Sequence, residues 1–209
     1  MPGAEWAERS LAIDSDVAPE QVEAWAKEGV LQSHAQKFLA RMRHALVVEE
    51  AVSLDDLPAL LGEARKLLPV PLRLVLVDYL GLLGSEGRDA YERASRLGKG
   101  LKAVAKAQSV AIVVAMQLSR AGGDGSEEVT PVMLRDSGVL EESLDFLLGC
   151  WRPGRAKNLD PPDELNLRDV LRVAVLKNRK GRDGRVVDLR FRPESRRLYE
   201  EADPFEAAI

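Results

Sequence analysis

Helical periodicity dominates the first third of the chain. Between residues 19 and 45, apolar positions recur at the spacing of one helical face, and Gly29 divides the stretch into two helices. Residues 46–48 are apolar and are predicted to form a short strand. A further helix is expected to begin with Ser53 as its N-cap and to continue to Leu68, where prolines follow.

The middle of the chain alternates between apolar runs and one helical pattern. Residues 72–79 are almost continuously apolar apart from Asp78 near the end, which predicts a strand buried on both faces of a parallel sheet. Residues 110–116 form a second such run, and residues 90–105 between them have helical periodicity. Two parallel strands joined by a helix form a βαβ unit, so the predicted fold class is α/β.

Shorter elements are expected in the C-terminal third. Residues 140–144 suggest a short helix and residues 146–151 a third strand. Residues 152–167 contain three prolines and many charges, and they are predicted to form an insertion loop. Residues 170–176 and 186–192 are typical of strands and are joined by a basic segment with two glycines, which predicts a β-hairpin.

Composition excludes several classes of protein. With 209 residues, 45% of them hydrophobic, the chain can bury one sizeable core, and a single domain is the default expectation. The single Cys150 excludes a disulfide framework and fits a reducing, cytoplasmic location. The longest apolar runs are too short to cross a bilayer, and the N-terminus does not have the pattern of a signal peptide. We therefore expect no membrane partner.

The charges are distributed unevenly along the chain. The formal net charge is −4, but residues 1–60 contain five Lys and Arg against eleven Asp and Glu, a balance of −6. Residues 168–197 contain eleven Lys and Arg against four Asp and Glu, a balance of +7. The basic segment is expected to face phosphates or an acidic neighbouring subunit, or else to be a solvated hairpin without a partner.

Two polar residues follow the two predicted parallel strands. Asp78 ends the first apolar run, at the sheet edge where α/β proteins bind ligands, and a carboxylate there could hold Mg²⁺ through water. Gln117 follows the second run, where it could sense a γ-phosphate. Taken separately, Asp78 could instead be a loop cap, and Gln117 an ordinary polar strand end.

Two further motifs could contact phosphates. In the segment LRDSG, Arg135 could bind a phosphate and the backbone near Gly138 could donate to one without reading bases; a helix N-cap by Ser137 is the alternative. In the hairpin, Lys177 and Arg179 are spaced to point to the same side, and a guanidinium can stabilise charge on a transferring phosphoryl group. The alternative is a solvated basic turn.

Taken together and in this order, the four motifs resemble the motor domain of the DnaB family of replicative DNA helicases. Residues 73–83 look like the Walker B strand of that family, and residues 95–120 resemble its helix and the strand ending in Gln-Leu-x-Arg. Residues 131–145 match its DNA-loop segment, and residues 176–192 its arginine-finger hairpin. The resemblance implies a RecA-like, mostly parallel β-sheet flanked by helices, N-terminally truncated, with a C-terminal β-hairpin.

This resemblance assigns roles to individual residues. Asp78 would be the Walker B carboxylate that binds Mg²⁺, and Gln117 would sense the γ-phosphate of ATP. Lys177 and Arg179 would complete the ATP site of a neighbouring subunit. The DNA loop would contact the backbone of single-stranded DNA through Arg135, Asp136 and Gly138. Family members form hexameric rings, so the implied partners are single-stranded DNA and further helicase subunits.

The same resemblance predicts the domain organisation. Residues 1–199 would form a partial motor domain, with a helical lead-in over 1–71 and the segment from Walker B to the arginine finger over 72–199. Residues 200–209 would be a C-terminal tail, and 152–167 is atypical of the family.

One family motif is missing from the sequence. The printed chain contains no G-x-x-x-x-G-K-[ST] loop to cradle phosphates, so we expect it to be inactive in ATP hydrolysis by itself, as a truncated or split helicase would be. The alternative is a non-catalytic RecA-fold module that binds single-stranded DNA or docks on a helicase ring. A recombinase-like or clock-like relative is disfavoured by the Lys-x-Arg hairpin.

Overall fold

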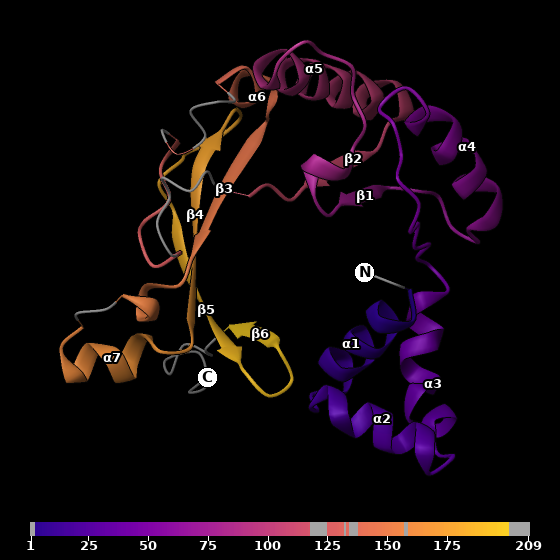
Figure 1. Cartoon of the computed structure of the whole chain (residues 1–209), viewed down its shortest axis with the longest axis vertical. Coiled ribbons are helices and arrows are strands. Elements are labelled where there is room, and N and C mark those ends of the chain that lie inside the picture. Colours follow the sequence, from indigo (N-terminus) through magenta and orange to yellow (C-terminus); the bar gives the residue numbers. More distant parts are fainter. Residues whose placement is uncertain (1–2, 118–124, 132, 134–137, 157–158, 201–209) are drawn as a thin grey trace. The chain divides into compact units, whose positions relative to one another are not determined.

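The computed structural model describes residues 3–117, 125–131, 133, 138–156 and 159–200. The chain forms two compact units, and Figure 1 labels the helices and strands of both. Unit 1 comprises Met1–Gly3, Lys37–Ser119 and Pro131–Leu144, and unit 2 comprises Ala4–Gln36, Arg120–Thr130 and Asp145–Ile209.

Helices and strands alternate through the middle of the chain, and strands predominate near its end. The helices are α1 (Gly3–Ser15), α2 (Pro19–Lys27), α3 (Leu31–Met42), α4 (Leu57–Leu67), α5 (Ala90–Gln108), α6 (Gly138–Ser143) and α7 (Pro161–Leu167), with short 3₁₀ turns η1 (Leu80–Leu82) and η4 (Pro153–Arg155). The strands are β1 (Leu74–Val77), β2 (Ala111–Val114), β3 (Phe146–Trp151), β4 (Val170–Asn178), β5 (Val186–Arg192) and β6 (Arg197–Glu200). None of the helices in these described parts of the chain is long and apolar enough to cross a membrane.

Unit 1 contains the predicted βαβ unit. Strands β1 and β2 pair in parallel, from Leu74 opposite Ala111 to Val77 opposite Val114, and α5 joins them. The side chain of Asp89 accepts a hydrogen bond from the Glu92 backbone at the start of α5, as an N-cap does. The core of this unit lies between α4, α5 and the strands. Its buried members are Leu54, Leu57, Leu61, Leu83, Leu97, Leu101 and Val110.

Only one face of the parallel pair is buried within the described residues, so the prediction of burial on both faces of β1 was wrong. Val75 and Val77 pack against the core of unit 1. Leu74 and Leu76 point to the other face and are 49% and 70% exposed. An apolar run predicts burial because most such strands lie between two helical layers, but α4 and α5 supply one layer here.

Helix α4 begins later than predicted. The helix starts at Leu57, and Ser53 is not its N-cap; instead the Ser53 hydroxyl donates to the Asp56 carboxylate (2.6 Å) and accepts from the Asp56 backbone (3.1 Å). The physical reason is Pro58, which has no N–H and is tolerated only in the first turn of a helix. A helix starting directly after Ser53 would place this proline in its interior.

The predicted helix break at Gly29 is confirmed, whereas the strand predicted over 46–48 is wrong. Gly29 lies between α2 and α3 with φ of 74°, a backbone conformation that favours glycine. Residues 46–48 have no regular secondary structure and are exposed, without a strand partner among the described residues. An apolar run becomes a strand only when another strand satisfies its backbone hydrogen bonds.

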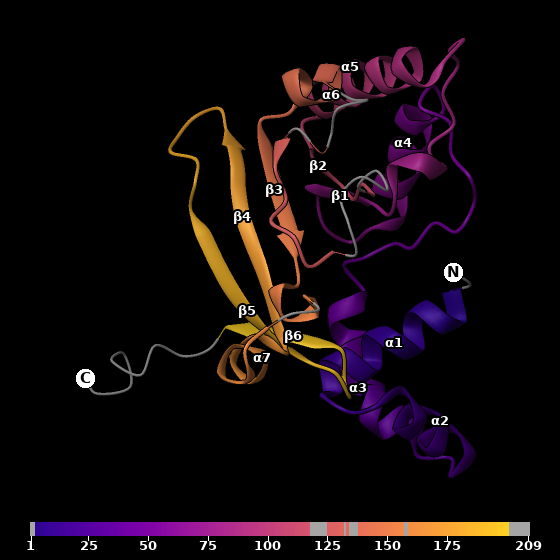
Figure 2. The same ribbon diagram turned by 60° about the vertical axis from the view of Figure 1, so that its left-hand side comes forward.

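Unit 2 is built on a four-stranded antiparallel sheet in the order β3-β4-β5-β6. Strand β3 forms over the predicted residues, and it pairs with β4 from Phe146 opposite Asn178 to Trp151 opposite Arg172. The predicted hairpin is confirmed as β4 and β5, which form a long ribbon with its turn at the end away from α7 (Figure 2). The hydrophobic pattern predicts neither α1 nor β6. In β6 every residue is exposed, so its sequence has no alternation of apolar and polar positions.

The segment 152–167 is not wholly a loop, contrary to the prediction. It contains η4 and α7, and the backbone of Gly154 lies so close to the Leu167 carbonyl that a Cβ at this position would overlap it. Pro161 and Pro162 occupy the first turn of α7, where a missing N–H costs nothing. The three prolines therefore begin short helices instead of preventing them.

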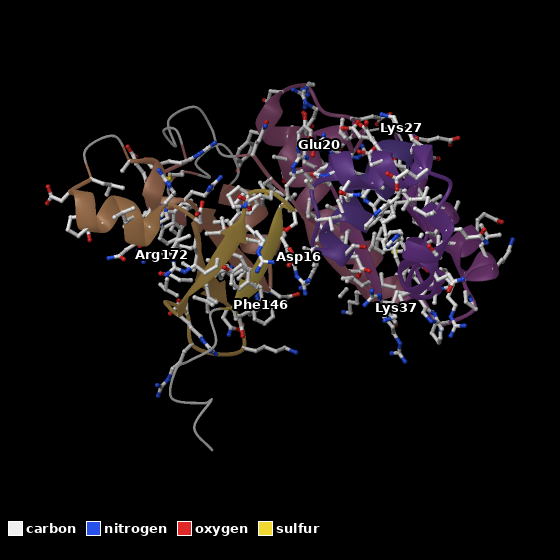
Figure 3. All side chains as sticks on the ribbon, turned by 90° about the horizontal axis from the view of Figure 1, so that it is seen from below. Asp16, Glu20, Lys27, Lys37, Phe146 and Arg172 are labelled. Carbon is white, nitrogen blue, oxygen red and sulfur yellow. The ribbon has the colours of Figure 1, made fainter. Side chains whose placement is uncertain are left out.

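A polar link joins the first helix of the chain to its last hairpin. Asp16, just after α1, accepts a hydrogen bond from the Ser195 hydroxyl (2.6 Å) and forms an ion pair with Arg192. Ser195 is only 1% exposed, and Figure 3 labels Asp16 beside the β5–β6 hairpin. A buried hydroxyl with a carboxylate partner is satisfied, so this link holds α1 to the sheet within unit 2.

Candidate functional site

The structure brings Asp78 and Gln117 to the same edge of the parallel sheet in unit 1. Asp78 directly follows β1, and Gln117 lies three residues beyond the end of β2. The two exit segments are bonded together: the Ala115 backbone N–H donates to the Val77 carbonyl and the Leu80 N–H donates to the Ala115 carbonyl, both at 2.9 Å. Both polar residues are exposed. This is the carboxyl edge of the strands, where α/β sheets bind ligands.

The donor set at this edge suits a magnesium ion that is held mainly by other oxygen ligands. No group of three or more His, Cys, Asp or Glu side chains that could hold a metal occurs in the part of the chain that the structure describes. Asp78 is a single exposed carboxylate, and Mg²⁺ commonly takes one or two protein carboxylates together with waters and substrate phosphates. Asp78 therefore fits such a site as one ligand.

The second predicted pair lies on the β4–β5 hairpin of unit 2. Lys177 belongs to β4, and Arg179 follows the last residue of that strand. Asn178, between them, organises the turn: its side-chain oxygen accepts from the Lys180 backbone (3.1 Å), and its amide donates to the Arg182 carbonyl (3.3 Å). The basic turn is thus a hydrogen-bonded structure with Arg179 exposed at its start.

Sequence reasoning missed the residue that holds Arg179. The Arg179 backbone N–H donates to the Asp145 carbonyl (2.9 Å), and a guanidinium nitrogen lies 3.9 Å from the Asp145 carboxylate. The two side chains are 49% and 46% exposed. No local motif signals this contact, because the register of β3 against β4 brings the two distant residues together.

An ion pair also crosses the middle of the hairpin. Arg172 and Asp188 are opposite each other on β4 and β5, and two guanidinium nitrogens bond both carboxylate oxygens at 2.7 and 2.8 Å. The hydrogen bond to Asp188 raises the pKa of Arg172 above its ordinary value. The same bond lowers the pKa of Asp188, although burial acts in the opposite direction. This pair stabilises the register of the ribbon that carries Lys177 and Arg179.

The predicted DNA-loop residues are only partly visible. Arg135 and Asp136 lie outside the described residues, and so does Ser137, the alternative N-cap; Gly138 is the first residue of α6. Helix α6 packs closely on α5, since a Cβ at Gly98 would lie 2.8 Å from a methyl carbon of Leu140.

The sequence as a whole matches the family model described as DnaB-like helicase C terminal domain, over residues 1–200. Among curated relatives, the chain is 30% identical to the replicative DNA helicase DnaB of Rickettsia felis over 155 residues, which cover 64% of this chain and 31% of that protein. It is 28% identical to the replicative DNA helicase DnaC of Bacillus subtilis over 120 residues, 55% of this chain and 25% of that protein. The chain thus spans about a third or less of the length of these relatives.

Two solved structures share the fold. One, an isolated ATPase domain, superposes with a TM-score of 0.80 at 19% identity, covering 96% of this chain and 72% of that domain. A DnaB-like replicative helicase, solved to describe its interactions with primase, superposes with a TM-score of 0.80 at 20% identity, covering 96% of this chain and 50% of that chain. These likenesses confirm the predicted α/β, RecA-like fold. With a family match over nearly its whole length, this chain belongs to the family of DnaB-like helicase C-terminal domains.

Proposed function

We propose that this chain acts as the C-terminal motor part of an ATP-driven replicative DNA helicase, and that it works in an assembly with subunits that carry complete ATP sites. Residues 1–199 would form this motor part. Two observations support the proposal. Asp78 and Gln117 follow adjacent parallel strands at one edge of the sheet, and Lys177 and Arg179 lie at the start of a hydrogen-bonded hairpin turn.

The sheet-edge pair would face nucleotide held by the same assembly. Asp78 would hold Mg²⁺ through water, and the ion would neutralise phosphate charge when bound. Gln117 has an amide that can donate to a phosphate oxygen and accept from a water. Because the exit segments of β1 and β2 are hydrogen-bonded to each other, a change at Asp78 would be transmitted directly to the backbone before Gln117.

The hairpin pair would act on a neighbouring subunit. An exposed guanidinium at a defined turn can stabilise charge on a transferring phosphoryl group, and Lys177 adds a second positive charge two residues away. The sequence lacks a phosphate-cradling loop, whose backbone amides and lysine supply most of the phosphate affinity in this class. We therefore expect the chain to contribute to hydrolysis in trans and to have no measurable ATPase activity alone.

The DNA-loop segment would track single-stranded DNA without reading its bases. Arg135, Asp136 and Gly138 would follow the phosphate backbone, with Gly138 anchored at the start of α6. In a ring, this would let the motor translocate over any sequence.

The test is an ATPase titration with mixed subunits. A DnaB-family subunit with a complete ATP site but a deleted arginine finger would be mixed with this chain, and we expect hydrolysis to be restored in part. Arg179→Ala should remove that rescue, with a loss on the order of 10³-fold in rate if the residue behaves like other fingers. Arg182→Ala, which removes an exposed arginine from the same turn, is the matched control and should rescue normally.

The result depends on the folded state being equal in all variants, which circular dichroism checks. Arg179→Lys should rescue poorly, because an ammonium cannot reproduce the planar fork of donors. Rescue that survives Arg179→Ala would reduce the hairpin to a solvated basic turn. A complete absence of rescue by the wild-type chain would favour the non-catalytic module instead.

A further inference from the structure

We infer that Asp145 is a positioning residue for Arg179: its carboxylate and its backbone carbonyl together hold the start of the hairpin turn so that the guanidinium is presented in one orientation. The inference rests on the proposed function of Arg179 as a finger that acts on a neighbouring subunit.

Two separate contacts join these residues. The Arg179 backbone N–H donates to the Asp145 carbonyl at 2.9 Å, which extends the β3–β4 ladder one step beyond the last strand pair, Phe146 opposite Asn178. The side chains lie 3.9 Å apart at their nearest charged atoms. The backbone contact fixes where Arg179 leaves the sheet, and the carboxylate then favours side-chain orientations on its own side.

The geometry suits presentation of the guanidinium and not its burial. At 3.9 Å the pair is an electrostatic contact without a tight hydrogen bond, and about half of each side chain remains exposed. An arginine locked by a short bidentate bond, such as Arg172 with Asp188, would have to break that bond before binding a phosphate. The looser contact with Asp145 restricts the directions in which the Arg179 side chain points, which lowers the entropy lost when the side chain binds a phosphate.

Asp145 also lies close in the sequence to the predicted DNA-loop segment. Asp145 follows α6 by two residues and begins the segment that leads into β3. The residues expected to follow DNA immediately precede and begin α6, so the same short stretch of chain carries the DNA-loop segment and the carboxylate beside Arg179.

The contact itself can be tested in the isolated chain by nuclear magnetic resonance of arginine side chains. The Arg179 Nε–Hε signal would be identified by its loss in Arg179→Lys. We expect Asp145→Asn to shift and broaden this signal, and Asp145→Glu to leave it closer to its wild-type position because the charge is kept. Asp183→Asn, which removes an exposed acidic residue from the same turn, should leave the signal in place.

The role is tested in the mixed-subunit ATPase assay. We expect Asp145→Asn to lower the kcat of rescue on the order of tenfold, with KM for ATP unchanged, because misplacing a catalytic group raises the barrier without weakening nucleotide binding elsewhere. Asp145→Glu should recover much of the loss, and Asp183→Asn should have no effect.

Each outcome decides one of the two proposals. An Arg179 signal that does not respond to Asp145→Asn, or rescue that is unchanged or increased in that variant, would overturn the positioning role; an increase would mean that the carboxylate competes with phosphate. If the signal responds but even the wild-type chain gives no rescue, the proposed finger function fails, and the contact between the two residues remains as a structural one.

Discussion

At the scale of single residues, the cross-strand pair Arg172–Asp188 gives a prediction with a definite sign. The pKa of Asp188 is lower in the folded chain than its ordinary value of about 3.9, because Arg172 bonds the ionised form. The stabilisation is therefore fully present above about pH 4 and is lost as the pH falls through the lowered folded pKa. Asp188→Asn should destabilise the chain by up to about 1 kcal/mol at pH 7, since both groups are partly exposed.

Urea unfolding at neutral and acidic pH measures this effect. The difference between wild type and Asp188→Asn should shrink as the solution becomes more acidic. Asp183→Asn, in the exposed turn of the same hairpin, should show a smaller difference at neutral pH. A difference for Asp188→Asn that persists undiminished at the most acidic pH would show that packing, and not the charge, is responsible.

The candidate residues differ in how far the sequence alone could predict their positions in the fold. Asp78 and Gln117 were predictable, because each directly follows an apolar run and parallel strands end at the same sheet edge. Asp145 was not, because its partner lies on another strand and the pairing register alone makes them neighbours. The roles assigned to all seven predicted residues stay predictions until the assays above are done: Asp78, Gln117, Arg135, Asp136, Gly138, Lys177 and Arg179.

At the scale of elements, two helix ends should respond oppositely to substitution. Ser109 caps α5 with φ of 50°, a left-handed conformation that costs a non-glycine residue about 1 kcal/mol or more. Ser109→Gly should therefore stabilise the chain by about 1 kcal/mol. Gly29, with φ of 74° and open space where a Cβ would lie, should lose about 1 kcal/mol on Gly29→Ala.

Thermal and urea unfolding of both variants check this pair. Ser109→Ala serves as the control. Alanine still has a Cβ, so it keeps the steric cost of the left-handed conformation, and this substitution should not stabilise the chain. If Ser109→Gly were neutral or destabilising, the gain in conformational entropy of the unfolded chain would outweigh the steric energy saved in the folded chain.

Element boundaries also show the limits of periodicity. The apolar spacing after Ser53 is genuine, since Leu57, Leu61 and Ala64 are buried on one face of α4. Its start was misplaced because a capping residue and a first-turn proline compete, and the proline imposes the stronger steric constraint.

At the scale of the whole molecule, the proposed DNA-loop segment predicts weak binding to single-stranded DNA. Binding should not depend on sequence, and it should fall steeply with salt because it rests on phosphate contacts. Arg135→Ala should weaken it about equally for different sequences and reduce the slope of log affinity against log salt by about one. Fluorescence anisotropy with labelled oligonucleotides of different composition measures both quantities.

The control removes a basic residue elsewhere. Lys27 on α2 is largely exposed, and Lys27→Ala changes the net charge by the same amount as Arg135→Ala. Equal effects from the two substitutions would mean that overall charge, and not the DNA-loop segment, determines affinity. Binding that is tight, insensitive to salt or selective for sequence would contradict the DNA-loop interpretation itself.

The sequence by itself determined the local features of this protein: the βαβ unit, the hairpin, the break at Gly29 and the polar residues that follow each parallel strand. These depend on spacing and backbone chemistry within a few residues, which the chain carries wherever it folds. Tertiary structure decided which apolar runs are covered, whether 46–48 finds a strand partner, and that β3 joins the antiparallel sheet beside β4. Those outcomes depend on partners distant in the sequence, because backbone groups and apolar faces are satisfied only by what packs against them.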